Sequence, residues 1–496
     1  MKEYLNYIDG KWKPSSSGKT FENRNPANWE EVIGVFPKSK GEDVEEAVQA
    51  AKKAYKMWSK VPAPKRGEIM RKAAEIFLER KEEIAKLLSR ENGKIIKEAR
   101  GDVQEGIDTA FYAFGEGRRL FSFNTPSELP DKFALTFRMP VGVFAVITPW
   151  NFPIALPAWK IFPALLAGNT VVFKPPSDAP ACAYELVKIL EEAGAPPGVI
   201  NLVFGGGSEV GEALLSHPDI RGVAFTGSSE VGARIAEVAG KHLKKVSLEL
   251  GGKNAQIVMP DANLDLALEG AIWGAYATAG QRCTATSRII VHTDIYDKFV
   301  EMFVERARTL KVGNPLDEST EMGPVINESQ RNKIHSYVEI GKNEGAKLVL
   351  GGEPLKGDEY DKGWFYKPTV FIDVDPNMRI AQEEIFGPVV AFIKAKNLND
   401  AIEILNGTKY GLSSSIYTQD INNAMKAIEK IEAGITYING PTIGAECHLP
   451  FGGVKATGNG HREGGWTVYE IFTEVKTVYI DYSGKLQKAQ IDTWEE

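Results

Sequence analysis

The chain has 496 residues, of which 43% are hydrophobic and 25% are charged. A chain of this length exceeds what one hydrophobic core supports, so we expect two or more globular domains. The formal net charge is −7 at pH 7. Proteins that bind nucleic acid carry a basic patch or stripe, so we expect no nucleic-acid partner.

The cysteines and histidines exclude further classes. Three scattered cysteines without a C-x-x-C pair rule out a disulfide scaffold and fit a reducing compartment. The six histidines show no metal-ligand spacing, and we expect no metal. The N-terminus lacks the apolar core of a signal peptide. The stretch 139–159 is uncharged over about the length of a membrane span, but prolines and Asn151 interrupt it. We therefore expect a cytoplasmic protein with no membrane partner.

The first half of the chain alternates helices and strands. Hydrophobic residues recur at helical spacing in several segments, most clearly in 62–92. In chain order we expect helices at 41–58, 62–92 and 98–120, a strand at 141–148, a turn at 149–153, a helix to 166, a strand at 170–174, a helix at 181–193, and strands at 199–204 and 222–226. This alternation is typical of a doubly wound parallel sheet, in which ligands bind beyond the carboxyl ends of the strands.

A second α/β unit follows residue 249. We expect a helix at 263–279, a strand at 287–292, helices at 295–310 and 328–344, and a strand near 369–373. The last long strand, 473–482, has nothing after it with which to pair. An uncovered strand edge usually finds a partner, so we expect a homo-oligomer, either a homodimer or a homotetramer.

Cys283 differs from the other two cysteines because small and polar residues surround it, in the segment GQRCTA (280–285). Small neighbours let a substrate and backbone amides approach the sulfur. A thiolate is a strong nucleophile whose reactivity depends on local potential and exposure. The alternative is a small buried thiol with a packing role.

Two other polar residues stand where their surroundings are apolar or rigid. Glu249 closes the apolar stretch before Gly251, and it is either a paired structural charge or a general base whose pKa is raised by its surroundings. Asn151 lies in the turn PWNFP (149–153). Its side chain is either a turn residue or a fixed amide donor for a developing oxyanion.

Two features could serve a phosphate-bearing ligand. The segment FTGSSEVG (225–232) follows a strand and opens a helix, so its backbone can approach a pyrophosphate at the helix N-terminus. It does not match the G-x-G-x-x-G fingerprint. Lys174 leaves an apolar strand directly before two prolines, and its ammonium group is either solvated or holds an anion.

Seven motifs together resemble those of the aldehyde dehydrogenase superfamily, in the family's order and roughly its spacing. They are PWNFP (149–153), FKPP (173–176), FTGSSEVG (225–232), LELGGKN (248–254), GQRCTA (280–285), EEIFGP (383–388) and PFGG (450–453). The resemblance implies an α/β fold with two doubly wound domains and a β oligomerisation arm. It places a Rossmann-like cofactor domain at 1–120 and 141–251, a catalytic domain at 252–453 and the arm at 121–140 and 465–490.

The resemblance also implies a mechanism for oxidising an aldehyde to a carboxylic acid. Cys283 attacks the carbonyl to give a thiohemiacetal, whose oxyanion is held by the Asn151 amide and the Cys283 backbone N–H. Hydride transfer to NAD or NADP leaves a thioester. Glu249 then activates the water that hydrolyses this thioester.

The implied cofactor contacts involve eight residues. The side chain of Lys174 would hold the adenosine ribose, with Ser177 close by, and Glu384 would hold the nicotinamide ribose with Phe386 against the ring. The residues expected near the pyrophosphate are Trp150, Thr226, Gly227 and Ser228. Trp159 and Phe451 suggest a largely apolar substrate tunnel.

The sequence departs from the family pattern at two places. Members selective for NAD often carry an acidic residue where this chain has Ser177, so we expect NADP to be accepted well. Asp178, one position later, could restore NAD selectivity if it turned toward the ribose. Before Glu463, the segment GNGHRE (458–463) has one residue more than the common G-x-G-R-E form, which puts an auxiliary role of Glu463 in doubt.

The substrate and two rival functions stay open. We favour an aliphatic aldehyde with a carboxylate at its far end, which Arg118 or Arg119 could meet, although an apolar tunnel would suit simple aldehydes. A CoA-acylating dehydrogenase of the same fold is one rival, and Glu249 argues against it because thiolysis needs no water-activating base. A non-catalytic binding or structural relative is the other, and intact Cys283, Asn151 and Glu384 argue against it.

Overall fold

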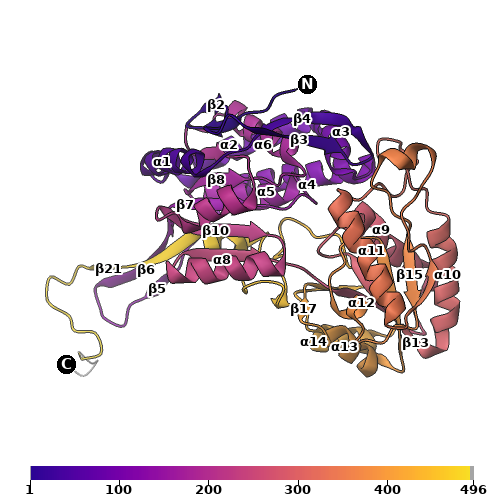
Figure 1. Ribbon diagram of the computed structural model, residues 1–496. Coiled ribbons are helices and arrows are strands. Elements are labelled where there is room, and N and C mark those ends of the chain that lie inside the picture. The colour runs from indigo at the N-terminus through magenta and orange to yellow at the C-terminus, as the bar shows by residue number, and fades with distance from the viewer. Residues whose placement is uncertain (1, 492–496) are drawn as a thin grey trace.

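The computed structural model describes residues 2–491 and consists of two α/β lobes and a projecting β arm (Figure 1). Each lobe is built on a seven-stranded sheet. The first sheet has the strand order β11-β10-β7-β8-β9-β1-β2. Its strands are β1 (Asn6–Ile8), β2 (Lys11–Lys13), β7 (Val143–Ile147), β8 (Thr170–Lys174), β9 (Ile200–Leu202), β10 (Ile220–Thr226) and β11 (Lys245–Glu249). Strands β7 to β11 run parallel, whereas β1 is antiparallel to both neighbours.

Strand β7 shows why its sequence is apolar without interruption. Successive residues of a strand point to opposite faces, and both faces of this sheet are covered. Phe144 and Val146 pack into the core formed with helices α2 to α6, whereas Val143 and Ala145 pack into the core formed with α1, α7 and α8. The expected doubly wound parallel sheet is therefore confirmed.

The helices of the first lobe match the expected ones with one difference. They are α1 (Gly41–Trp58), α2 (Ala63–Glu79), α3 (Lys81–Asn92), α4 (Ile96–Glu116), α5 (Ala155–Leu166), α6 (Pro180–Glu192), η1 (Gly207–Gly211), α7 (Glu212–Ser216) and α8 (Ser229–Lys241). The single helix expected at 62–92 is two helices. Arg80 lies between them with φ −100° and ψ 10°, and its side chain pairs with Glu83 and Glu185. The apolar periodicity of the sequence continues across this break, so the periodicity alone did not reveal that the helix ends at residue 79.

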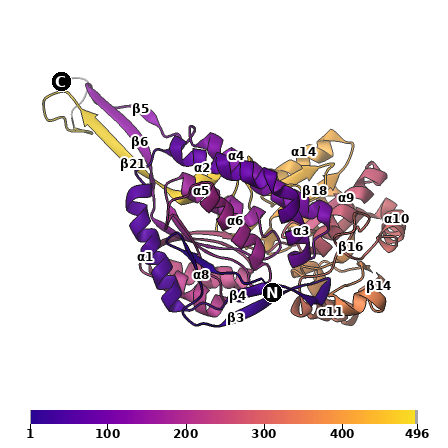
Figure 2. The ribbon, with the colours of Figure 1, turned by 90° about the horizontal axis from the view of Figure 1, so that it is seen from above.

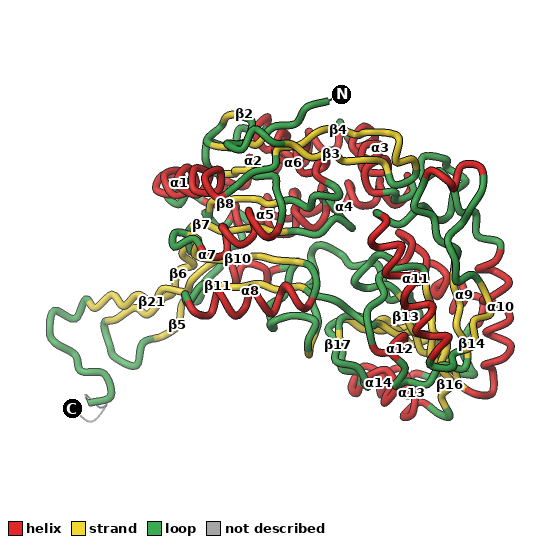
Figure 3. The backbone as a smooth tube through the Cα atoms, viewed as in Figure 1, coloured by secondary structure: helices red, strands yellow, loops and turns green. Residues whose placement is uncertain are grey.

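The second lobe holds a sheet of order β14-β15-β16-β13-β12-β18-β19, parallel except for the pair β14–β15. Its strands are β12 (Asn254–Val258), β13 (Thr286–His292), β14 (Lys347–Leu350), β15 (Thr369–Ile372), β16 (Val389–Ala395), β18 (Ser413–Tyr417) and β19 (Ile435–Ile438). Its helical segments are α9 (Leu264–Tyr276), η2 (Ala277–Gly280), η3 (Thr293–Ile295), α10 (Tyr296–Arg308), α11 (Glu328–Asn343), η4 (Asp358–Lys362), α12 (Arg379–Gln382), α13 (Leu398–Asn406) and α14 (Ile421–Lys430). The tube in Figure 3 shows these helices on both sides of the sheet.

The final strand has a partner in its own chain. Strand β21 (Thr473–Asp481) pairs along its whole length with β6 (Lys132–Pro140), and β6 also pairs with β5 (Asn124–Pro126). This three-stranded arm extends away from both lobes (Figure 2). The prediction of an uncovered edge holds for one side of the strand only, because β21 lies at the edge of the arm sheet.

Short elements complete the fold. They are the hairpin β3 (Thr20–Asn25) and β4 (Asn28–Pro37), the pair β17 (Tyr410–Gly411) and β20 (Val454–Lys455), and the turn η5 (Trp466–Val468) with α15 (Tyr469–Phe472). Within residues 2–491, no helix is both long and apolar enough to cross a membrane. The uncharged stretch 139–159 forms the end of β6, strand β7, a turn and the start of α5.

Candidate active site

The carboxyl ends of four parallel strands bring several predicted site residues to one edge of the first sheet. In register, Ile147 at the end of β7 lies opposite Lys174 of β8 on one side and Phe225 of β10 on the other, and Thr226 lies opposite Glu249 of β11. The chain passes from β7 to β8 on one side, whereas β10 flanks β7 on the other. Such a reversal of strand order opens a crevice that binds ligands in doubly wound sheets.

One pocket at this edge collects most of the predicted residues. Both lobes line it. The predicted residues among its lining are Trp150, Asn151, Thr226, Gly227, Ser228, Cys283, Glu384 and Phe386. Gln330 and Lys333 of α11 also line it, and the sequence analysis missed them. The Gln330 side-chain amide donates to the backbone oxygens of Ile385 and Phe386, at 3.2 and 2.7 Å, and so holds the loop of the EEIFGP motif.

The segment that carries Cys283 is a tight left-handed turn. Gly280 has φ +71°, and a Cβ there would lie 2.2 Å from the backbone oxygen of Gly387, so only glycine fits. The Cys283 backbone oxygen accepts a hydrogen bond from the Asn254 side-chain amide at 2.7 Å. Burial raises the pKa of the Cys283 thiol to about 12, and the carboxylates of Glu384 and Glu249 add to this effect. The thiol is therefore protonated at neutral pH.

Asn151 is tethered to this turn. Its side chain is 2% exposed, and its amide nitrogen Nδ2 donates to the backbone oxygen of Gln281 at 3.1 Å. The amide oxygen Oδ1 has no partner among the described residues. The Asn151 amide, from the first lobe, thus contacts a residue of the second lobe that lies two positions before Cys283.

Glu249 is buried and lacks hydrogen-bond partners. The residue is 3% exposed, and neither carboxylate oxygen has a partner within residues 2–491. A Cβ at Gly452 would lie 2.5 Å from its Oε1 atom, so glycine at 452 makes room for this side chain. Burial raises the pKa of Glu249 well above its usual value and the Glu463 carboxylate raises it further, against the opposing charges of Lys160 and Arg462.

A buried ion pair lies next to Glu249. Lys160 Nζ pairs with the Glu463 carboxylate and also donates to Thr226 Oγ1 at 2.6 Å. The sequence placed Glu463 in doubt, and the structure buries it beside Glu249 in spite of the extra residue. Lys160 was missed, although a lysine in the otherwise apolar α5 was a signal that could have found it.

The extra residue is accommodated upstream of Glu463. The Asn459 side chain pairs with the open edge of β11: its Oδ1 accepts from Leu248 N at 3.0 Å and its Nδ2 donates to Val246 O at 2.7 Å. Its side chain thus takes the place of a neighbouring strand. The segment after it then returns to Phe451, whose backbone exchanges two hydrogen bonds with that of Glu463.

The two predicted tunnel aromatics adjoin the nucleophile. The rings of Trp159 and Phe451 meet edge to face, 4.9 Å apart, and both are buried. Together with Leu412 they form a small apolar cluster against which Cys283 packs.

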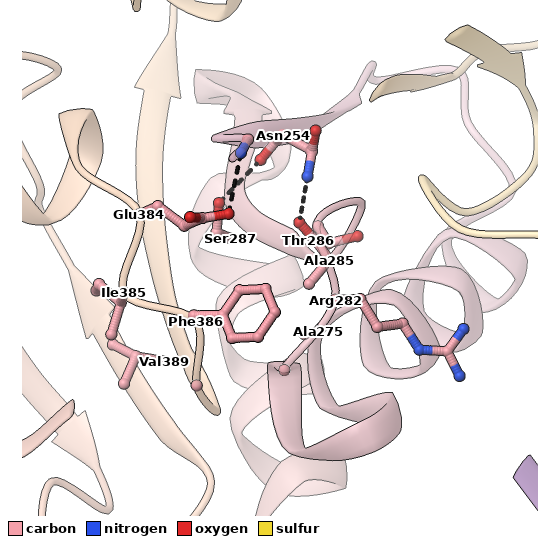
Figure 4. A pocket seen from close by; sticks show the side chains of 13 residues that line it. Asn254, Ala275, Arg282, Ala285, Thr286, Ser287, Glu384, Ile385, Phe386 and Val389 are labelled. Atoms are coloured by element: carbon pink, nitrogen blue, oxygen red, sulfur yellow. Dashed lines mark hydrogen bonds between the residues drawn. The ribbon is translucent and has the colours of Figure 1, made fainter. Parts of the chain in front are cut away.

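Glu384 and Phe386 lie on a loop of the second lobe and line both the pocket that holds Cys283 and a second pocket, which Figure 4 shows. Glu384 Oε1 accepts a hydrogen bond from the backbone N–H of Gly252 at 3.0 Å. Burial raises the pKa of Glu384, and the Gly252 N–H and Lys333 oppose this rise. The ring of Phe386 meets that of Trp150 edge to face at 5.5 Å.

Lys174 and Ser177 lie outside this pocket, at the end of β8. Burial lowers the pKa of Lys174 to about 8, and Asp178 opposes the shift. Its Nζ donates to the backbone oxygen of Pro175 at 2.9 Å. Ser177 is exposed, and the Asp178 carboxylate accepts a hydrogen bond from Asn327 Nδ2 at 2.9 Å.

Arg118 and Arg119 are not brought to the site. Both are exposed at the end of α4, and they pair with Glu68 at 3.6 Å and Glu116 at 3.4 Å. The cation next to the nucleophile is Arg282, which the sequence analysis did not single out. Its Nε donates to Thr278 Oγ1 at 3.1 Å, and its guanidinium lies over the rings of Phe152 and Trp273.

This geometry indicates a class of enzyme: the carboxyl edge of a doubly wound sheet faces a cysteine thiol that has an amide group and a buried carboxyl group beside it. Comparison with known proteins identifies the family, because the aldehyde dehydrogenase family model matches residues 12–478. The chain belongs to the aldehyde dehydrogenase family, and it is an NAD(P)-dependent oxidoreductase that acts on aldehydes.

Individual relatives agree with this assignment. The chain is 44% identical to alpha-ketoglutaric semialdehyde dehydrogenase of Bacillus subtilis, over 96% of this chain and 98% of that protein. It is 41% identical to 2,5-dioxopentanoate dehydrogenase of Saccharolobus solfataricus, over 97% and 99% of the two chains. Betaine aldehyde dehydrogenase of Staphylococcus aureus, solved in complex with NAD+, superposes with a TM-score of 0.95 at 37% identity, over 97% of this chain and 95% of that one.

Proposed function

We propose that Cys283 is the nucleophile of the aldehyde oxidation and that Asn151 holds the oxyanion. The observation that carries this assignment is the tether between the Asn151 amide and the turn preceding Cys283. The thiol gives its proton to water as the sulfur bonds to the carbonyl carbon, and the π electron pair of the carbonyl moves to its oxygen, which takes the negative charge. A preorganised amide donor stabilises that charge.

Glu249 serves the later, hydrolytic half of the reaction. As a carboxylate, it accepts a proton from the water that attacks the thioester, and the Cys283 thiolate is released with the acid product. The neighbouring pair Lys160–Glu463 holds charge close to Glu249 and influences its pKa. A buried carboxyl group with a raised pKa is suited to such a role.

The residues at the sheet edge fit a dinucleotide. The N-terminus of α8, capped by Ser228, suits a pyrophosphate, and Gly227 lets the backbone approach it. Glu384 offers a carboxylate for a ribose hydroxyl, and the end of β8 offers Lys174 for the second ribose. The bound cofactor supplies the hydride acceptor, while these residues orient it against the Cys283 side of the pocket.

The assignment of Glu249 is tested by the Glu249→Gln variant. We expect a stoichiometric burst of NAD(P)H followed by a stall, because the amide cannot take a proton from water and the thioester accumulates. Rapid-mixing absorbance at 340 nm measures the burst. Retention of full steady-state turnover would contradict the role. Adding CoA to the wild-type enzyme tests the rival: a requirement for CoA, with an acyl-CoA product, would favour the acylating reaction.

For the substrate, we propose an aliphatic aldehyde with a carboxylate at its far end. Two relatives bear the names of semialdehyde dehydrogenases of this kind. Arg282 supports the idea from within the chain: only its Nε has a hydrogen-bond partner among the described residues, and its Nη2 lies 3.8 Å from the nearest Glu98 oxygen. Free guanidinium N–H groups can bind a carboxylate in bidentate fashion.

This substrate proposal predicts a selective loss in the Arg282→Met variant. Catalytic efficiency should fall about 10-fold to 100-fold for a carboxylated semialdehyde, the range of one lost charge-assisted hydrogen-bonding group. Efficiency should change little for an uncharged aldehyde of matching length. Arg118→Met is the matched control, since that side chain lies elsewhere. Equal losses on both aldehydes, or wild-type preference for the uncharged one, would contradict the proposal.

We also propose the domain division and assembly suggested by the sequence. Residues 1–120 and 141–251 form the cofactor domain, 252–453 the catalytic domain, and 121–140 with 465–490 the arm through which copies associate as a homodimer or homotetramer. The open edge of β21 supports this assembly. The three unpaired cysteines support a reducing, cytoplasmic location.

A further inference from the structure

A buried carboxylate on α4 contacts the turn that carries the nucleophile. Glu98 is 6% exposed, and its two oxygens lie 3.1 and 2.9 Å from the backbone nitrogen of Thr278, which donates to them. The Oε2 atom also accepts a hydrogen bond from Thr278 Oγ1 at 3.0 Å. Among the described residues, its hydrogen bonds come from Thr278, five positions before Cys283, and Arg282 Nη2 lies 3.8 Å from Oε1 as an ion-pair partner.

Thr278, which donates hydrogen bonds to Glu98, has an unfavourable backbone conformation. Thr278 has φ 53° and ψ 31°, Ala279 has φ 53° and ψ 37°, and Gly280 follows with φ 71°. L-residues rarely adopt this left-handed region, and a β-branched residue such as threonine is an outlier there. Such conformations persist only where surrounding contacts impose them, and they cluster at active sites.

The turn 278–280 is connected by hydrogen bonds to Asn151, the proposed oxyanion donor. The Thr278 backbone oxygen accepts hydrogen bonds from Gln281 N at 3.1 Å and from Gln281 Nε2 at 3.0 Å. The Gln281 backbone oxygen in turn accepts from Asn151 Nδ2 at 3.1 Å. A continuous set of contacts thus runs from Glu98 through Thr278 and Gln281 to Asn151.

Helices α3 and α4 also hold the segment that carries Asn151. Asn92 Nδ2 donates to the backbone oxygen of Trp150 at 2.8 Å, and Asp102 Oδ1 accepts from Ala155 N at 2.8 Å. Asp102 is itself paired with buried Lys94 at 2.8 Å. The same pair of helices therefore fixes both segments that meet at the nucleophile, and Glu98 is its contact with the Cys283 side.

We propose that Glu98 is a positioning residue: it imposes the left-handed turn 278–280 and thereby sets the placement of the Cys283 sulfur relative to the Asn151 amide. Its partners among the described residues, Thr278 by hydrogen bonds and Arg282 by an ion pair at 3.8 Å, do not line the pocket that holds Cys283, so Glu98 acts through the turn. The inference rests on the proposed roles of Cys283 and Asn151.

The first test compares Glu98→Ala with Asp43→Asn. Asp43 is a matched control because it is also buried and accepts hydrogen bonds from one residue's N–H and hydroxyl, those of Ser16, at 2.7 and 2.8 Å, and from Lys40 N at 2.9 Å. It lies on α1, away from the pocket. For Glu98→Ala we expect kcat to fall about 10-fold to 100-fold, the cost of a small misplacement of reacting groups. KM for NAD(P) should stay near the wild-type value. Asp43→Asn should lower the Tm and leave kcat unchanged.

The second test is rescue by glycine. Glycine adopts positive φ without steric cost, so Thr278→Gly should need no carboxylate to hold the turn. We expect Glu98→Ala/Thr278→Gly to recover much of the kcat lost in Glu98→Ala. The rate of iodoacetamide alkylation of Cys283, which involves no aldehyde, should rise in Glu98→Ala and return toward the wild-type rate in the double variant.

Several outcomes would overturn the inference. A folded Glu98→Ala protein with wild-type kcat and alkylation rate would do so, as would a kcat loss no larger than that of Asp43→Asn at equal loss of Tm. If Glu98→Ala does not fold, Thr278→Val removes the hydroxyl's contacts with Glu98 and with Arg282 Nε and keeps the backbone contact with Glu98, and wild-type kcat in that variant would count against the proposal. The alkylation readout separates this inference from the mechanism: a wrong substrate assignment leaves it unchanged, and a wrong nucleophile appears as activity in Cys283→Ala.

Discussion

At the scale of residues, the resting state of Cys283 sets a condition on its chemistry. Burial and two neighbouring carboxyl groups raise its thiol pKa to about 12. A thiol reacts through its thiolate, so the reactivity of Cys283 at neutral pH is low. We expect iodoacetamide inactivation to accelerate continuously from pH 7 to 9.5. In Glu384→Gln, loss of one negative neighbour should lower the pKa and make alkylation faster at pH 8.

This prediction has an internal control. Cys182→Ala and Cys447→Ala should show the wild-type pH profile and remain active, whereas Cys283→Ala should lose dehydrogenation and still bind cofactor. A plateau in the inactivation rate below pH 8 would show that the free enzyme already holds a thiolate.

Cofactor choice is also decided by single residues. Ser177 lacks the carboxylate that would repel a 2′-phosphate, and Asp178 is bonded to Asn327. Burial lowers the pKa of Lys174 to about 8, so its ammonium group is charged below that pH and neutral above it. KM for NADP should therefore rise from pH 7 to 9 more steeply than KM for NAD. In Ser177→Glu, KM for NADP should rise at least about tenfold, since like charges about 4 Å apart cost several kcal/mol at an effective dielectric of 20. If the wild-type enzyme rejects NADP, Asp178 is the selector.

Two of the residues that the sequence failed to reveal, Lys160 and Glu98, have partners that are remote in the chain. Lys160 pairs with Glu463 across 303 positions, and Glu98 contacts Thr278 across 180. A motif records residues near one another in sequence, so it identified Cys283 and Glu249 and left their supports unseen. The same limit explains Arg118, which local sequence made a candidate and the fold places elsewhere.

At the scale of elements, the sequence predicted what depends on periodicity. The strand at 170–174 and the helices at 41–58 and 328–344 agree with β8, α1 and α11 to within one residue. What it could not predict depends on tertiary contact. Arg80 breaks one periodic helix in two, and the partner of β21 lies more than 300 residues upstream in β6.

The turn η2 is a second case in which tertiary contacts determine a conformation that the local sequence does not predict. Small residues before Cys283 indicated close approach, and Gly280 does lie against Gly387. Nothing local indicated that Thr278 and Ala279 would be left-handed, because neither residue type favours that conformation. The Glu98 carboxylate, which comes from α4, holds Thr278 in a conformation that its residue type does not favour. Functional sites are where such conflicts between local and tertiary structure are expected.

At the scale of the whole molecule, the arm is the part that projects from the two lobes. Its sheet projects from the first lobe, and β21 leaves one edge unpaired (Figure 2). Large apolar side chains on it stay exposed, with exposed fractions of 54% for Phe133, 62% for Val475 and 64% for Tyr479. An open edge with apolar side chains is a site for pairing with another chain.

The proposal that copies of the chain associate through the arm leads to a prediction that is independent of catalysis. In Val475→Lys/Tyr479→Lys, both substituted side chains are exposed and the β21–β6 backbone pairing is kept, so each chain should fold and keep its far-ultraviolet circular dichroism. Burying one large apolar side chain is worth about 1.5–3 kcal/mol, and a symmetric interface counts each substitution twice. The dissociation constant should therefore rise by several orders of magnitude, which analytical ultracentrifugation measures as a shift toward monomer. Leu78→Lys is the control, because it also replaces an exposed apolar side chain by lysine, at a residue of α2 that is 53% exposed. This variant should leave the assembly intact. If the arm variant sediments as the wild type does, copies associate through another surface, and the open edge of β21 serves no contact between them.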